Sequence, residues 1–266
     1  MISIQLANAA CALVSTLGAS SLDASAWFGD EPGQSSAAIP AQEESWTFDA
    51  FVYYWSASVS GSLTVDGQEI DLEGGDGGGF SGETALSGFL GEFEASRGPW
   101  SLVYAPVIVN LDMTGNESGG IDADVEIRAR IHEGFAAHAL GDRWDWLAGA
   151  RYYELDTDVD LSNGGVPVGS LGSNHSWVDP IVGVRFHDDL GEDWSVRSRV
   201  DVGGFGLGSK FAWNADAYAA YRFSSWCTGD LGYRALSIDF EDGSGSDRLA
   251  YNLTMSGPVI GVTFSF

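Results

Sequence analysis

The chain has 266 residues, with 12 Lys or Arg against 38 Asp or Glu, so its formal net charge is −26. This acidity argues against a nucleic-acid partner, because phosphate binding needs clustered basic side chains. The chain holds 36 glycines and 12% aromatic residues, and it lacks the run of about 18 apolar residues that a transmembrane helix needs. The composition favours a β protein.

The N-terminal part of the chain has the pattern of an exported protein. Residues 1–26 contain an apolar stretch followed by Ala24-Ser25-Ala26, which predicts a secretory signal peptide with an A-x-A cleavage site. Residues 27–45 are acidic and rich in Pro, Ser and Gln, which indicates a flexible segment. Cys11 lies in the predicted leader, so Cys227 has no internal disulfide partner.

Residues 46–266 form the predicted folded domain, in which apolar and polar residues alternate with the period of two that is typical of β-strands. In 211–223, for example, Phe211, Trp213 and Ala215 share one face, whereas Asn214 and Asp216 lie on the other. We predict a closed antiparallel transmembrane barrel of about ten strands, with eight or twelve as alternatives. The predicted strands are 46–57, 85–97, 100–112, 120–140, 144–160, 176–188, 193–206, 209–224, 226–240 and 248–266.

The predicted connections alternate between short turns and longer acidic loops. The turns are Ser96–Pro99, Gly141–Arg143, Asp189–Asp193 and Ser224-Ser225, and the loops are 58–84, 113–119, 161–175 and 241–247. Outer-membrane barrels have this arrangement, with short turns at one end and long loops at the other.

Tryptophans recur where strands leave the short-turn side. Trp prefers the interface between membrane and water, so this repeat predicts an aromatic girdle. The interface tryptophans are Trp46, Trp100, Trp144 and Trp194, with Trp226 at an imperfect register.

Charged side chains within the strands fall opposite the apolar faces. A membrane barrel places such residues in its lumen, and the excess of Arg over Lys favours desolvated ion pairs. Glu133 is the exception, because it follows Val125 and Ile131 onto the predicted lipid face. The predicted lumen charges are Glu92, Glu94, Asp124, Glu126, Arg128, Arg130, Arg151, Asp179, Arg185, Arg197, Arg199, Asp201, Asp216, Arg222, Asp230 and Arg234.

Several stretches resemble the small outer-membrane β-barrel proteins of Gram-negative bacteria. They include AGARYYELD (148–156), DWSVRSRVDVGGFGLGS (193–209) and the C-terminal MSGPVIGVTFSF (255–266). Alternate apolar residues at Ile260, Val262, Phe264 and Phe266 are similar to the signal that the barrel-assembly machinery recognises. The resemblance implies an outer-membrane location, with the lipid bilayer and that machinery as partners, and it implies no activity.

Three functions remain open on the sequence. The first is a structural or surface-interaction protein with a narrow charged lumen, and the second is a narrow porin for small solutes. The third is a rim-site enzyme using His175, Asp179, Asp156 and Asp158, but we expect no enzyme, since no catalytic motif is present.

Two further groups of residues could bind ions. His132 and His138 are expected on the inward face, hydrogen-bonded rather than ligating a metal. The segment Asp71–Gly79 has carboxylates that could bind divalent cations, but it lacks the regular spacing of a calcium loop, which favours a solvated flexible loop. No cofactor is expected.

Overall fold

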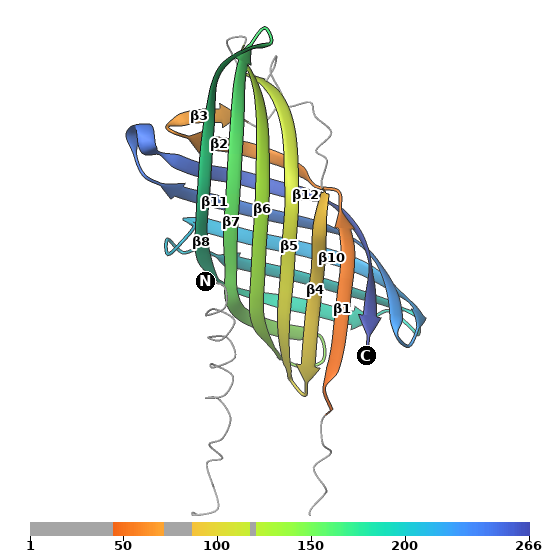
Figure 1. Cartoon of the computed structure of the whole chain (residues 1–266). Coiled ribbons are helices and arrows are strands. Elements are labelled where there is room, and N and C mark those ends of the chain that lie inside the picture. Colours follow the sequence, from red (N-terminus) through yellow and green to blue (C-terminus); the bar gives the residue numbers. More distant parts are fainter. Residues whose placement is uncertain (1–44, 72–86, 118–120) are drawn as a thin grey trace, which may run out of the picture. The chain divides into compact units, whose positions relative to one another are not determined.

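The computed structural model describes residues 45–71, 87–117 and 121–266. The predicted signal peptide and almost all of the segment 27–45 lie outside these ranges. Within them the chain forms twelve strands and one short 3-10 helix, η2 (Gly245–Asp247) (Figure 1). No helix in the described ranges is long and apolar enough to span a membrane. The strands are β1 (Thr47–Trp55), β2 (Ser58–Val65), β3 (Gln68–Asp71), β4 (Ser87–Arg97), β5 (Trp100–Glu117), β6 (Ile121–Ala139), β7 (Trp144–Asn163), β8 (Val166–Asp189), β9 (Trp194–Gly203), β10 (Phe211–Ser224), β11 (Cys227–Asp242) and β12 (Leu249–Ser265).

The strands close into one antiparallel barrel. Its order is β1-β4-β5-β6-β7-β8-β9-β10-β11-β12, and β12 returns to pair with β1. The other half of β12 pairs with β2, so β1 and β2 occupy the same position in the wall, one after the other. The predicted ten-stranded barrel is therefore confirmed, with β3 added as the second strand of a hairpin with β2.

The short turns lie together at one end of the barrel, which we call the lower end. They are Gly98-Pro99, residues 140–143, residues 190–193 and Ser225-Trp226, close to the predicted positions. The opposite end is the upper end.

Two of the long loops predicted for the upper end are wrong. β5 and β6 continue through most of 113–119, and β7 and β8 continue through most of 161–175. A two-residue turn, Gly164-Gly165, joins β7 to β8, and both glycines have positive φ, at 59° and 79°. Such a turn matches the twist of long paired strands, so the strands need no loop. In the predicted loop 58–84, residues 58–71 form the β2–β3 hairpin and 72–84 lie outside the described residues.

The upper half of the barrel is built like a soluble protein. Apolar side chains from several strands fill its interior, including Leu63, Tyr153 and Tyr251, which are all fully buried. The outer face of the same strands is polar, and on β7 exposed Asp158 and Asp160 alternate with buried Thr157 and Val159.

The lower half has the opposite polarity. On β10, buried Asn214 and Tyr218 face the interior, while Phe211 and Phe223 face outward at 47% and 67% exposure. We call the outward apolar side chains of the lower half the belt. Its large exposed members include Phe48, Val52, Tyr54, Phe93, Leu102, Tyr104, Ile108, Trp146, Val178, Val182, Val184, Val200, Phe211, Phe223, Leu231, Tyr233 and Ile260.

The polarity changes within β6 without any change in the backbone. The register of β6 with β7 is continuous from Asp122 to Ala139. Along it, the buried side chains pass from Ile131 to Glu133, while the outward side chains pass from Arg130 to His132 and Gly134. The outward face of β6 therefore changes from charged to uncharged, while the inward face holds Glu133 between the buried apolar residues Ile131 and Phe135.

Candidate functional site

A cluster of four charged side chains lies in the interior where the two halves meet. Arg151 donates from Nε to Glu133 at 2.6 Å and from Nη2 to Asp201 at 2.8 Å. Arg199 donates from Nη1 to the other oxygen of Glu133 at 2.6 Å. All four side chains are 6% exposed or less. Buried charges persist only when paired, and each member here has a partner of opposite sign.

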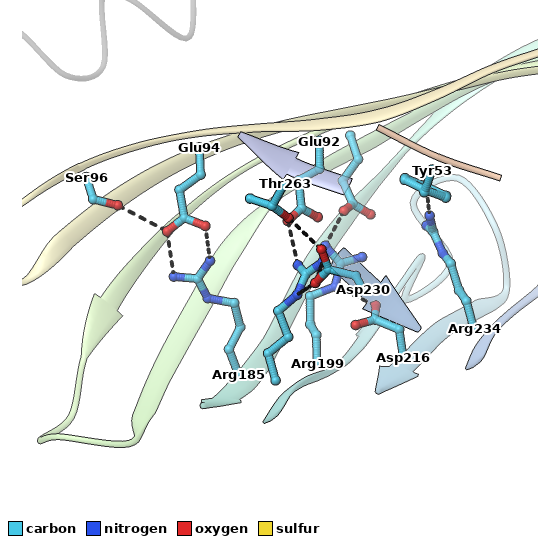
Figure 2. Close-up of polar contacts among 12 residues, drawn as sticks. Tyr53, Glu92, Glu94, Ser96, Arg185, Arg199, Asp216, Asp230, Arg234 and Thr263 are labelled. Carbon is cyan, nitrogen blue, oxygen red and sulfur yellow. Dashed lines mark hydrogen bonds and ion pairs between the residues drawn. The ribbon is translucent and has the colours of Figure 1, made fainter. Parts of the chain in front are cut away.

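A second ion pair lies nearer the lower end. Arg185 donates to both oxygens of Glu94, at 2.9 and 3.2 Å, and from Nε to Asp145 at 3.1 Å. Ser96 donates a further hydrogen bond to Glu94 at 3.1 Å (Figure 2). The two-pronged geometry fixes the guanidinium plane against the carboxylate.

Arg197 is held by aromatic rings as well as by charge. Its guanidinium lies 4.4 Å from the ring centres of both Phe51 and Tyr218, in cation–π contact. Asp230 lies 3.2 Å from Nη2, and Glu92 lies 3.6 Å from Nη1. Arg197 thereby ties β1 and β4 to β9, β10 and β11 across the lumen.

Two other predicted lumen residues bond neutral partners. Arg234 donates to Asn214 at 2.9 Å and to the Tyr53 hydroxyl at 2.6 Å (Figure 2). Asp179 is fully buried and accepts a hydrogen bond from the backbone N–H of Ser209 at 2.6 Å. Asp216 lies 3.6 Å from Arg199 and completes the inward set.

The four β6 residues predicted to be lumen charges lie outside the barrel, contrary to prediction. Arg128 and Arg130 are 41% and 50% exposed and pair with carboxylates of the outer surface. Alternation gives two faces but not which one points inward, and here the apolar face fills the upper core. Glu133 shares that inward face, so it does not lie on the lipid face as its alternation with Val125 and Ile131 had suggested. The outward residues on β6 are Asp124, Glu126, Arg128 and Arg130.

Three more placements differ from the sequence analysis. His132 and His138 face outward, where His132 shares a 2.8 Å hydrogen bond with Tyr104 and His138 contacts Trp100, with ring centres 4.5 Å apart. Arg222 is exposed, and its 3.4 Å hydrogen bond is to the backbone carbonyl of Glu192 at the lower end.

A cavity of about 400 Å³ lies in the lower part of the interior. Its lining includes Glu92, Glu94, Arg185, Arg197 and Asp216 together with the turn Gly98-Pro99. The cavity therefore adjoins the lower end, while the apolar core occupies the interior of the upper half.

The predicted interface and assembly residues form exposed sets. Trp46, Trp100, Trp144, Trp194 and Trp226 are 44% to 58% exposed, and all lie near the lower end. Alternation along β12 puts Ile260, Val262, Phe264 and Phe266 on one outward face, with Ile260 and Phe266 at 60% and 77% exposure.

The residues considered for a rim enzyme are not brought together. His175 pairs with Asp242 at 2.9 Å near the upper end. Asp156 and Asp158 lie on the outer face and pair with Arg128, whereas Asp179 lies lower in the interior. Asp242 could not be predicted as the partner of His175, because β8 and β11 are not neighbours in the sheet. Of the segment Asp71–Gly79, all but Asp71 lies outside the described residues, and no group of three or more His, Cys, Asp or Glu in the described ranges could hold a metal ion.

No protein-family model matches the chain, and no curated protein sequence matches it. Solved structures do match. The outer membrane protease OmpT from Escherichia coli aligns with a TM-score of 0.53 at 10% identity, over 83% of this chain and 97% of that one. The attachment invasion locus protein Ail of Yersinia pestis covers 84% and 99%, with a TM-score of 0.35 and 10% identity. The likeness to OmpT shows that the barrel has the fold of Gram-negative outer-membrane β-barrel proteins, and it shows the fold alone.

Proposed function

We propose that this chain is an integral outer-membrane protein with a structural role, whose barrel does not conduct solutes. The observation that supports it best is the belt. Many large apolar side chains of the lower half face outward while charged ones are buried inside, an order that suits lipid and is costly in water.

The height of the belt agrees with a bilayer. On β7 its outward face runs from Trp144 to Tyr152, a span of nine residues. At about 3.3 Å per residue and a strand tilt of about 40°, this is about 23 Å along the barrel axis. The apolar band of outer-membrane barrels is about 25 Å tall. We take the strand segments that contribute to the belt as membrane-spanning, and the upper half as lying outside the cell.

The interior favours a structural role over passage of solutes. A solute leaving the lower cavity would have to displace the paired Glu133–Arg151–Asp201 cluster and then cross the apolar core around Tyr153 and Tyr251. A narrow porin is the second candidate, favoured by the charged cavity at the lower end. We propose no catalytic role, since the rim residues do not converge.

Refolding tests both parts of the proposal. The protein should require detergent or lipid, and its folded barrel should shift in gel mobility on heating. A monomer that is soluble without detergent and shows no shift would overturn the membrane assignment. In planar bilayers the inserted protein should give no conductance steps, and reproducible steps would instead support the porin.

A further inference from the structure

The connection between β9 and β10, residues Gly204–Lys210, has an apolar tip. Phe205 is 54% exposed and Leu207 is 80% exposed, the highest value among the large apolar residues described. Residues 204–208 have the sequence GFGLG, so no charged side chain lies within the tip. The hydrophobic effect favours burial of both side chains, so their exposure to water is unfavourable.

The base of this loop is fixed to the barrel. Ser209 is fully buried, donates its backbone N–H to Asp179 at 2.6 Å, and its hydroxyl accepts from Trp177 Nε1 at 2.9 Å. Gly204 donates to the Pro180 carbonyl at 3.2 Å. The tip therefore projects from a rigid support.

The tip also has an unfavourable backbone conformation. Phe205 has a φ of +52°, in the left-handed region that bulky residues rarely adopt. Gly206, beside it, has a φ of +75°, and a side chain there would meet nothing within 4 Å. Phe205 thus takes the strained conformation beside open space, and its aromatic ring is exposed to the surroundings of the protein.

The tip continues the belt. Val200 on β9 and Phe211 on β10, the large exposed apolar residues on either side of the loop, are 51% and 47% exposed. On β6 and β7 the belt ends instead at the charged pair of Arg130 and Glu154. Figure 1 shows that β10, β11 and β12 run obliquely behind the steep β5–β8 strands.

We propose that residues 204–208 are a membrane anchor, with Phe205 and Leu207 inserted among the acyl chains of the outer leaflet. The inference rests on the proposed membrane location. The occupant is lipid rather than protein because the tip is continuous with the belt. Lys210, the only lysine of the chain, marks the return to water: it is 56% exposed and pairs with Glu241.

Site-specific fluorescence tests the anchor. Cys11 and Cys227 are replaced by Ser, and single cysteines are introduced as Leu207→Cys, Val200→Cys in the belt and Val166→Cys at the upper end. Each full-length protein is labelled with an environment-sensitive dye and refolded into phosphatidylcholine vesicles with or without brominated acyl chains. Leu207 is the probe because its substitution leaves the strained Phe205 in place.

The label at 207 should be quenched by brominated lipid at least half as strongly as that at 200, whereas that at 166 should respond only to aqueous iodide. If brominated lipid quenches the label at 200 but only iodide quenches the label at 207, the anchor is overturned and the membrane assignment is unaffected. A label at 207 shielded from both quenchers indicates a contact with a second copy and also overturns the anchor. If the label at 200 is not quenched by lipid, the proposed function itself fails.

Discussion

Arg151 lies directly opposite Glu133 on neighbouring strands, and the two side chains form a buried ion pair at the centre of the barrel, with Nε to Oε2 at 2.6 Å. Arg151 is 0% exposed and Glu133 is 2% exposed. Because Arg199 uses the second oxygen of the same carboxylate, the single residue Glu133 neutralises charge from both β7 and β9.

Replacing Glu133 by Gln should therefore destabilise the protein strongly. Arg151 and Arg199 would both lose the charge of Glu133 in a desolvated interior. Breaking a buried ion pair costs about 3–5 kcal/mol. Urea unfolding of the refolded variant in detergent measures the change. Glu154→Gln, which removes the exposed partner of Arg130, is the matched control and should cost about 1 kcal/mol or less. Equal losses in the two variants would contradict the role assigned to Glu133.

Trp177 should be a main support of the upper core. Its ring stacks 3.9 Å from Phe240 and 4.8 Å from Tyr153, and its Nε1 holds Ser209. Trp177→Ala should lower the free energy of unfolding by about 3–5 kcal/mol, the usual cost of an aromatic cavity. Trp226→Ala removes a ring that is 58% exposed and should have a clearly smaller effect in detergent. The same urea titration checks both, and a larger loss for Trp226 would refute the prediction.

Strand packing should tolerate a methyl group at one glycine and not at another. A Cβ on Gly149 would lie 2.1 Å from the carbonyl oxygen of Gly134 and 2.5 Å from Phe135, so Gly149→Ala should force β6 and β7 apart. The expected cost is about 1–3 kcal/mol. At Gly169 nothing lies within 4 Å, and alanine there should be neutral or slightly stabilising. Thermal unfolding of the two variants should separate them, and similar midpoints would count against the close approach.

Stability should fall at acidic pH through ion pairs near the upper end of the barrel. Hydrogen bonds from Lys210 and Arg248 lower the pKa of Glu241 from 4.5 to about 2. The hydrogen bond from His175 likewise lowers the pKa of Asp242. Because the folded pKa of Glu241 is below the unfolded one, its contribution is complete above about pH 4.5 and disappears as the pH falls toward 2.

The unfolding midpoint of the native chain should accordingly decrease between pH 4.5 and 2, and Glu241→Gln should reduce the slope in that window. Midpoints measured at half-unit intervals provide the check. An unchanged slope in Glu241→Gln would show that its pairs with Lys210 and Arg248 add nothing to stability.

The last residue should matter for assembly more than for stability. Phe266 is 77% exposed, and its backbone is held by hydrogen bonds with Phe48. Phe266→Ser should thus refold in vitro with nearly native stability, yet reduce the amount of folded barrel in cells several-fold if the assembly machinery reads this residue. Phe223→Ser, at a similarly exposed position in β10, is the control. Equal cellular yields would exclude a role for Phe266 in recognition.

The ten strands of the barrel wall were predictable because each of them keeps a period of two, and β10 even shows which face is apolar. The β2–β3 hairpin was not predicted and falls in the predicted loop 58–84. The direction of that face was not predictable. On β6 the apolar residues Val125–Ile131 point inward, while on β10 the apolar residues point outward, and alternation is the same in both cases. Only the position of each segment along the barrel decides its direction, and that position depends on pairing with other strands.

The pairing of the interior charges was even harder to predict from the sequence. Arg197 meets Phe51 and Asp230 through contacts between residues more than 30 positions apart. The sequence indicates that Arg and carboxylates share a lumen, but not which ones meet. The extension of β7 and β8 through 161–175 was missed for a local reason, because Gly164-Gly165 was interpreted as part of a loop rather than as a tight turn.

In the proposed membrane location, the change in the outward side chains of β6 from charged to uncharged would set the thickness of the bilayer that the barrel fits. Arg130 and the tryptophans at the lower end are joined by unbroken strands, so their separation along the strands is fixed by the number of residues between them. A thicker bilayer would press acyl chains against Arg130, and a thinner one would leave belt aromatics in water, at a fraction of a kcal/mol for each ångström of mismatch. The barrel should therefore insert best into membranes whose hydrocarbon thickness matches the height of its belt.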